Sequence, residues 1–204
     1  MAINTYHYRE HPAERPGVPL LFLFHGTGGN ESQFFDFGHQ LLPAASIVSL
    51  RGDVSEQGAL RFFRRTGEGV YDMDDLAQRT AAMKSFVKAH IKAASPSATI
   101  GLGYSNGANI LASTMLDDPS LFDAAVLMHP LIPWQPESKA NYKDKKILMT
   151  AGENDAICPA PLTQGLADYF TRQGGNVTLQ WHPGGHEIRQ EEISAIQDFL
   201  QPYK

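Results

Sequence analysis

The sequence contains a single cysteine, Cys158, among 204 residues. One cysteine cannot form an internal disulfide, and such scarcity suits a reducing compartment. No apolar run approaches the roughly 18 residues that are needed to cross a bilayer. The first ten residues are polar, which is unlike a secretory signal peptide. We therefore expect a cytoplasmic protein without a membrane partner.

Positive charge is also scarce, because 17 lysines and arginines face 22 aspartates and glutamates, for a net charge of −5. A nucleic-acid-binding domain normally carries a basic patch or stripe, so we expect no nucleic-acid partner. The chain lacks repeats, low-complexity tracts and linkers as well. At this length and with 42% hydrophobic residues, one domain spanning residues 1–204 is expected.

Short apolar runs alternate along the chain with segments of helical periodicity. The predicted strands are Thr5–Arg9 at an edge, Val18–His25, Ser46–Leu50, Ala98–Leu102, Ala124–His129, Lys146–Ala151 and Val177–His182. The predicted helices are Ser32–Leu42, Asp72–Ala94, Ala108–Leu116, Pro161–Gln173 and Glu187–Leu200. Such alternation predicts an α/β fold with a mainly parallel twisted sheet and helices on both faces. The segment Arg51–Val70 is predicted to be a long loop, and loops of that length are often functional.

The most informative stretch is Gly101–Asn109, which contains Gly103-x-Ser105-x-Gly107 between a predicted strand and a predicted helix. A sharp strand-to-helix turn of this pattern resembles the nucleophile elbow of α/β-hydrolases. Glycine avoids collisions in such a strained turn, and the helix N-terminus favours developing negative charge. Because 18 glycines make chance matches easy, the motif alone is equally compatible with a plain tight turn.

Two further residues complete a hydrolytic triad. A serine hydroxyl needs a base that takes its proton, and the base needs an orienting carboxylate. Parallel sheets gather such groups just past the carboxyl ends of their strands, where Asp155 and His186 stand. The chain order Ser105, Asp155, His186 is the order of the α/β-hydrolases. We therefore predict these residues as nucleophile, orienting acid and base.

Other roles for these residues are open at this point. Asp155 is also a typical turn residue, Glu153 is a rival acid, and His186 could simply begin a helix. His182 and His186 are four positions apart, but the Pro-Gly-Gly between them excludes a helix that presents both to one metal ion. We therefore predict no metal site and interpret His182 and His129 as packing residues at strand ends.

Ester hydrolysis also needs N–H donors for the oxyanion of its tetrahedral intermediate. In this fold one donor is the backbone N–H after the nucleophile, here that of Asn106, and the other lies in a loop after an earlier strand. The His25–Gly28 segment is that loop, and Thr27 is the second predicted donor. A glycine turn without function is the alternative.

Together these motifs resemble the phospholipase/carboxylesterase family of α/β-hydrolases, which is related to the dienelactone hydrolases and acyl-protein thioesterases. The resemblance runs from about Val18 to the C-terminus. Arg51-Gly52, Arg61-Phe62-Phe63 and Asp72 with its neighbours also resemble the bacterial carboxylesterase branch associated with hydroquinone or quinone stress. The resemblance implies the same nucleophile, base, acid and oxyanion donors.

Two positions depart from the family pattern. Many members carry glutamine after the serine, where this chain has Asn106. Dienelactone hydrolases proper use a cysteine nucleophile, where this chain has Ser105. General ester hydrolysis is therefore expected rather than a lactone-specific activity.

The connection Pro130–Lys145 is too short and proline-rich for the lid domain that larger hydrolases insert there, so the site should be open and shallow. Four apolar residues that follow sheet strands are predicted pocket walls: Phe62, Phe63, Trp134 and Ile157. The alternative, which the sequence supports equally well, is that two or more of these residues only pack beneath the loop. Cys158 is interpreted as a small packing residue.

The sequence thus predicts a serine carboxylesterase that hydrolyses small or short-chain carboxylic esters through an acyl-enzyme and without a cofactor. A thioesterase or lysophospholipase would use the same chemistry but prefer long acyl groups. The alternative from another class is a ligand-binding module on a hydrolase fold. The expected partner is a small-molecule ester, and the sequence leaves both a monomer and a homodimer open.

Overall fold

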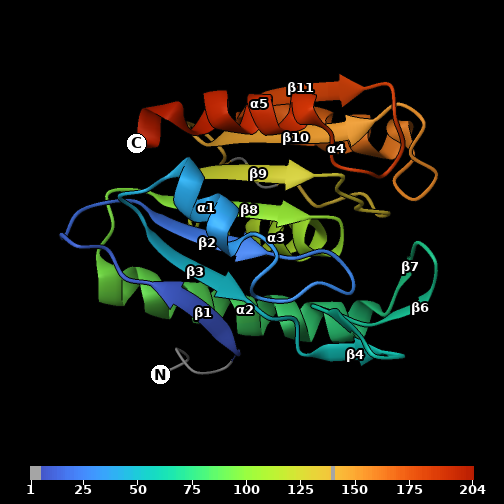
Figure 1. Cartoon of the computed structure of the whole chain (residues 1–204). Helices are drawn as coiled ribbons and strands as arrows, with labels where there is room; N and C mark the ends of the chain where they lie inside the picture. The colour runs from blue at the N-terminus through green and yellow to red at the C-terminus, as the bar shows by residue number, and fades with distance from the viewer. Residues whose placement is uncertain (1–5, 139–140) are drawn as a thin grey trace.

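A seven-stranded, mainly parallel sheet forms the centre of the protein (Figure 1). The computed structural model describes residues 6–138 and 141–204. The strand order is β1-β3-β2-β8-β9-β10-β11, in which β1 pairs antiparallel with β3 and the other pairs are parallel. The strands are β1 Tyr8–His11, β2 Leu20–Phe24, β3 Ser46–Leu50, β8 Thr99–Tyr104, β9 Ala124–Met128, β10 Lys146–Gly152 and β11 Asn176–His182.

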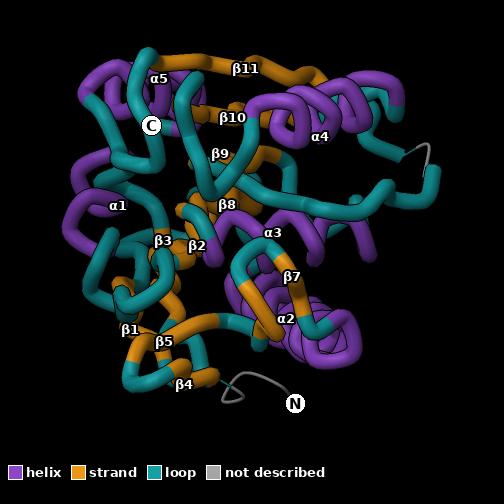
Figure 2. Tube along the Cα trace, turned by 90° about the vertical axis from the view of Figure 1, so that its right-hand side faces the viewer, coloured by secondary structure: helices purple, strands orange, loops and turns teal. Residues whose placement is uncertain are grey.

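Helices cover both faces of the sheet, as the edge-on view of Figure 2 shows. One face carries α1 (Phe35–Leu41) and α5 (Gln190–Leu200), which leads into a short 3₁₀ helix, η1 (Gln201–Tyr203). The other face carries α2 (Met73–Ala94), α3 (Asn106–Asp117) and α4 (Ala160–Arg172). The predicted α/β architecture is therefore confirmed. Within the described residues, no helix combines the length and apolarity that a membrane crossing requires.

The central strand β2 explains why its sequence is continuously apolar. Leu20, Phe22 and Phe24 pack on the face of α2 and α3, whereas Leu21 and Leu23 pack on the face of α1 and α5. Successive side chains of a strand point to opposite faces, and both faces here are covered. The carboxyl end of β2 is therefore held in place from both sides.

One segment differs from the prediction in kind, and several predicted elements, among them the edge strand, differ at their ends. Arg51–Val70 contains most of two small hairpins, β4 (Val54–Glu56) with β5 (Ala59–Arg61) and β6 (Arg65–Gly67) with β7 (Val70–Tyr71). Strands of two or three residues are too short to show an alternating pattern of apolar and polar residues, so the sequence predicted a loop there. The predicted edge strand Thr5–Arg9 is shifted along the chain, since the observed strand β1 begins at Tyr8 and ends at His11. Thr5 lies outside the described residues.

The turn from β8 into α3 requires glycine on both sides of Ser105. A Cβ on Gly103 would lie 2.7 Å from the carbonyl carbon of Gly107. A Cβ on Gly107 would collide with the carbonyl oxygens of Phe24 and His25 at the end of β2. The Gly-x-Ser-x-Gly pattern is thus a packing requirement between the first turn of α3 and the sheet.

This packing predicts that Gly107→Ala lowers the free energy of unfolding by about 1–3 kcal/mol, since backbone oxygens of a central strand cannot give way. Gly165→Ala is the matched control, because Gly165 lies in α4 with nothing within 4 Å of an added Cβ. Alanine is favoured there by about 1 kcal/mol. Urea unfolding followed by circular dichroism measures both, and a Gly107→Ala midpoint at or above that of the wild type would contradict the packing argument.

Candidate active site

Ser105 stands in the turn between β8 and α3 with φ 52° and ψ −118°. Residues other than glycine rarely adopt such angles, and they persist only where the surroundings hold them. The Ser105 N–H donates to the Met128 carbonyl at 2.9 Å, and the Ser105 carbonyl accepts from the Asn109 N–H at 2.9 Å. The hydroxyl is therefore presented at the carboxyl edge of the sheet by a fixed backbone.

His186 and Asp155 reach Ser105 from two neighbouring loops. His186 Nε2 lies 2.9 Å from Ser105 Oγ, and His186 Nδ1 lies 2.7 Å from Asp155 Oδ2. Asp155 follows β10 and His186 follows β11, and these strands pair in parallel. With Nδ1–H held by the carboxylate, Nε2 is free to accept the serine proton. The rival acid, Glu153, is exposed.

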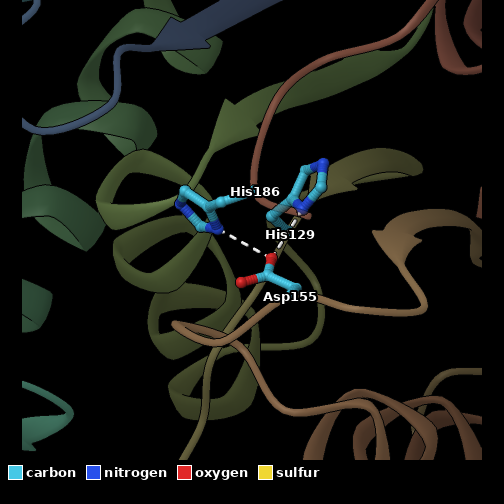
Figure 3. Close-up of side chains that lie close together, drawn as sticks. All are labelled: His129, Asp155 and His186. Carbon is cyan, nitrogen blue, oxygen red and sulfur yellow. Dashed lines mark hydrogen bonds and ion pairs between the residues drawn. The ribbon is translucent and has the colours of Figure 1, made fainter. Parts of the chain in front are cut away.

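The Asp155 carboxylate is fully buried and accepts four hydrogen bonds. Its Oδ1 accepts the N–H groups of Ile157 at 2.8 Å and Cys158 at 2.9 Å. Its Oδ2 faces the Nδ1 atoms of both His186 and His129 (Figure 3). Burial alone would raise the pKa of Asp155, but the Cys158 N–H and the two imidazoles outweigh burial and hold that pKa below its ordinary value.

A buried polar cluster continues behind Asp155. His129 Nε2 lies 3.1 Å from Glu192 Oε1, and His182 Nε2 lies 3.3 Å from Glu192 Oε2. Thr150 Oγ1 donates to Glu192 Oε1 at 2.6 Å. The interpretation of His129 and His182 as packing residues was incomplete, because both are buried yet also bond to a carboxylate. No sequence motif links these positions, which lie just after β9 and on β10, β11 and α5.

Two trios in the described residues place nitrogen and oxygen atoms close enough to surround an ion. They are His129 with Asp155 and His186, and His129 with His182 and Glu192. In the first, both imidazoles bond directly to one carboxylate oxygen. In the second, His182 Nδ1 accepts the Gly184 N–H at 3.1 Å, so the ring proton sits on Nε2, where an ion would need a lone pair. Hydrogen bonding thus accounts for both trios, and the absence of a metal stays a prediction.

The two predicted oxyanion donors belong to residues that line the same cavity as Ser105. Asn106 is the first residue of α3, where backbone N–H groups have no partner inside the helix. Thr27 lies in the loop after β2, and its Oγ1 accepts from Arg61 Nη1 at 2.9 Å. The next residue, Gly28, donates its N–H to the Leu60 carbonyl at 2.9 Å. The β4–β5 hairpin therefore holds this loop, a support that the sequence did not indicate.

His25 fixes the start of the same loop. Its Nε2 accepts the Gly52 N–H at 2.8 Å, and its Nδ1 lies 2.7 Å from the Gly26 carbonyl. This pattern needs a neutral ring with its proton on Nδ1. Burial lowers the pKa of His25, which favours that neutral form.

A cavity of about 260 Å³ opens at Ser105, and only one predicted pocket wall, Ile157, belongs to it. Phe62 and Phe63 are fully buried in the core beside α2 and α3, so their prediction as walls was wrong. Trp134 lines two other hollows that do not include Ser105. Phe62 and Phe63, which lie between β5 and β6, fill the core instead of the cavity wall. The cavity wall that the sequence did not indicate comprises Arg61, Arg65, Glu68, Gly69, Tyr71, Tyr104, Asn109, Leu131 and Cys158.

Known proteins share this arrangement of strands and loops. Residues 6–194 match the family described as the dienelactone hydrolase family. The chain belongs to the dienelactone hydrolase family. The chain is also 34% identical to the hydrolase MhqD of Bacillus subtilis (strain 168) over 184 residues, which cover 89% of this chain and 92% of MhqD.

Two solved structures extend the family comparison. The carboxylesterase of Bacillus cereus is 32% identical with a TM-score of 0.92, covering 98% of this chain and 96% of that one. The protein Atu2452 of Agrobacterium tumefaciens str. C58, of unknown function, is 54% identical with a TM-score of 0.96 over the whole of both chains. This member of the dienelactone hydrolase family is therefore an ester hydrolase of the carboxylesterase type, as the sequence motifs predicted.

The one cysteine of this chain, Cys158, is almost fully buried although it belongs to the cavity wall. The residue is 1% exposed, and its Sγ lies 3.2 Å from the His129 carbonyl oxygen. Burial and the nearby Asp155 raise the pKa of the Cys158 thiol. The reactive thiolate is thus disfavoured.

We therefore expect a thiol reagent such as DTNB, at about pH 8, to leave the folded protein unmodified and its hydrolytic activity intact. After unfolding in guanidinium chloride, Cys158 should react stoichiometrically. Absorbance of the released thiolate measures the reaction. Rapid labelling of the folded protein with parallel loss of activity would contradict the burial argument.

Proposed function

We propose that this protein is a serine carboxylesterase that hydrolyses small or short-chain carboxylic esters through an acyl-enzyme. The observation that carries the proposal is the unbroken chain of hydrogen bonds from Ser105 Oγ through His186 to Asp155, at 2.9 Å and 2.7 Å. The chain begins inside a cavity and ends on a buried carboxylate. Such an arrangement raises the nucleophilicity of a serine hydroxyl.

In the first half of the reaction, Ser105 Oγ attacks the ester carbonyl carbon while His186 Nε2 takes the hydroxyl proton. The oxyanion of the tetrahedral intermediate accepts hydrogen bonds from the N–H groups of Thr27 and Asn106. Each such donor typically lowers the barrier by about 3–4 kcal/mol. The intermediate then releases the alcohol, which leaves with the proton from His186.

In the second half, water attacks the acyl group on Ser105 while His186 Nε2 takes a proton from that water. The new tetrahedral intermediate breaks its bond to Ser105 Oγ, which recovers the proton from His186. The products are the carboxylic acid and the free enzyme. Asp155 stays ionised throughout and stabilises the imidazolium in both halves.

The cavity size favours a short acyl group over the long chains of the thioesterase or lysophospholipase alternative. Its volume of about 260 Å³ lies below the roughly 300–1,000 Å³ of pockets that bury drug-sized ligands. The described parts of the connection Pro130–Lys145 contain no helix or strand, so no lid extends the cavity there. The intact hydrogen-bond chain argues against a ligand-binding module. A cytoplasmic location stays a prediction.

We expect Ser105→Ala to lower kcat for p-nitrophenyl acetate by about 10⁴–10⁶-fold, because no other group can form the acyl-enzyme. Ser85→Ala is the control, since Ser85 is exposed on α2 and its hydroxyl bonds only to the preceding turn at Ala81 in the described structure. It should keep wild-type activity. Undiminished turnover by Ser105→Ala, with the fold intact by circular dichroism, would contradict the proposal.

A chain-length series separates the two substrate classes. We expect kcat/KM for p-nitrophenyl esters to peak at acetate or butyrate and to fall steeply by octanoate, because longer chains extend beyond the cavity. Initial rates below the critical micelle concentration of each ester measure this. A rising trend up to palmitate, or a preference for acyl thioesters, would favour the alternative.

A further inference from the structure

His129 makes contacts that the proposed reaction does not use, although it touches the orienting acid directly. It follows β9 with a φ of 49° and is fully buried. We propose that His129 is a positioning residue for the triad, a buried imidazolium held between Asp155 and Glu192 that fixes Asp155 toward His186. This inference rests on the proposed function, since it assigns Asp155 and His186 their catalytic roles.

The geometry shows why Asp155 needs a second imidazole. His129 Nδ1 lies 2.8 Å from Asp155 Oδ2, the same oxygen that receives His186 Nδ1 at 2.7 Å. The two rings approach this oxygen from different sides (Figure 3). Without His129, Oδ2 would be held by His186 alone, which is the residue that Asp155 has to orient.

The partners of His129 define its charge. Nδ1 faces Asp155 Oδ2, and Nε2 faces Glu192 Oε1 at 3.1 Å, a shorter distance than the 3.5 Å to His182 Nε2. A neutral imidazole carries only one N–H, so donating to both carboxylates requires the doubly protonated ring. Burial lowers the pKa of His129, but the bonds to Glu192 and Asp155 outweigh burial and raise that pKa above its ordinary value.

The other contacts of Glu192 agree with an anionic carboxylate. Thr150 Oγ1 bonds to Oε1 at 2.6 Å, and the Arg189 N–H donates to Oε2 at 2.7 Å. His182 Nδ1 accepts the Gly184 N–H, so the His182 proton is on Nε2, which lies 3.3 Å from Glu192 Oε2 and 3.5 Å from His129 Nε2. Burial would raise the pKa of Glu192, yet its bonds to His129 and Thr150 hold that pKa below its ordinary value.

Four more titratable side chains face His129 in the described structure. The rings of His186, His182 and Tyr104 lie 5.0, 5.3 and 5.8 Å from its ring, and Cys158 Sγ lies 3.2 Å from its carbonyl oxygen. Burial raises the pKa of Tyr104 to about 12 and raises that of Cys158, so both stay neutral near pH 7. Of the rings around His129, only that of His186 gains a proton in the proposed reaction, and a positive charge on His129 opposes that gain.

Two substitutions separate the charge of His129 from its hydrogen bonds. In His129→Asn, the side-chain amide nitrogen stands in for Nδ1 and can still donate to Asp155, and asparagine tolerates the positive φ. In Glu192→Gln, the amide can donate to an uncharged His129 Nε2 while its oxygen accepts from Arg189 and His182. Both variants remove the imidazolium and keep a donor on Asp155.

The experiment measures kcat/KM for p-nitrophenyl acetate against pH, together with the ¹⁵N NMR signals of the histidine rings. We expect the acid limb of the profile to move up by about one pH unit in His129→Asn, the lower end of what a charge within 4–6 Å does. Glu192→Gln should move it in the same direction by less, because the lost carboxylate charge partly offsets the lost imidazolium. His90→Asn is the control, since His90 is buried on α2, and it should leave the limb in place.

In the NMR spectrum at about pH 7, both ring nitrogens of His129 should carry a proton in the wild type and only one in Glu192→Gln. An unprotonated His129 nitrogen in the wild type, or an unmoved acid limb in His129→Asn, would overturn the inference. The NMR spectra of the wild type and of Glu192→Gln test the charge of His129 even if His129→Asn does not fold. Hydrolysis that survives Ser105→Ala would instead refute the proposed function, without changing the spectrum of His129.

Discussion

The buried carboxylate of Asp155 is the point at which the hydrogen bonds of the site meet. Two backbone N–H groups hold one oxygen, and two imidazoles hold the other. A carboxylate is costly to bury unless its hydrogen bonds are satisfied. These donors come from the loop that carries Asp155, from the loop after β11 and from the end of β9. The correct folding of three neighbouring strand ends is therefore a condition for a stable, ionised acid beside His186.

A second constraint acts on the other side of Ser105. The glycines of the elbow bring α3 against the carbonyl oxygens at the end of β2. That same strand end leads into the loop with Thr27, which His25, Arg61 and the β4–β5 hairpin hold in place. Ser105 and the loop that carries Thr27 thus both adjoin the contact between α3 and the end of β2. The proposed nucleophile and one proposed oxyanion donor are therefore held by the same part of the sheet.

The sequence predicted the parts of the site that follow from strand position. Ser105, Asp155 and His186 stand directly after apolar runs, and parallel strands place their carboxyl ends at one edge. The order of helices and strands was predictable because short apolar runs alternate with longer segments of helical periodicity. The hairpins between Arg51 and Tyr71 were not, because their strands are too short to alternate. Phe62 and Phe63 were misassigned because hydrophobicity does not tell a cavity wall from the core.

The contact of His129 with Glu192 depends on the directions of side chains from β9 and α5, which no linear pattern encodes. The central claim is that an ionised Asp155 activates Ser105 through His186. The most direct test is the second-order rate of Ser105 phosphonylation by a fluorophosphonate in Asp155→Asn, with the modified peptide mapped by mass spectrometry. The account predicts a rate about 10⁴-fold below that of the wild type. An Asp155→Asn rate equal to that of the wild type, or a label on another residue, would contradict it.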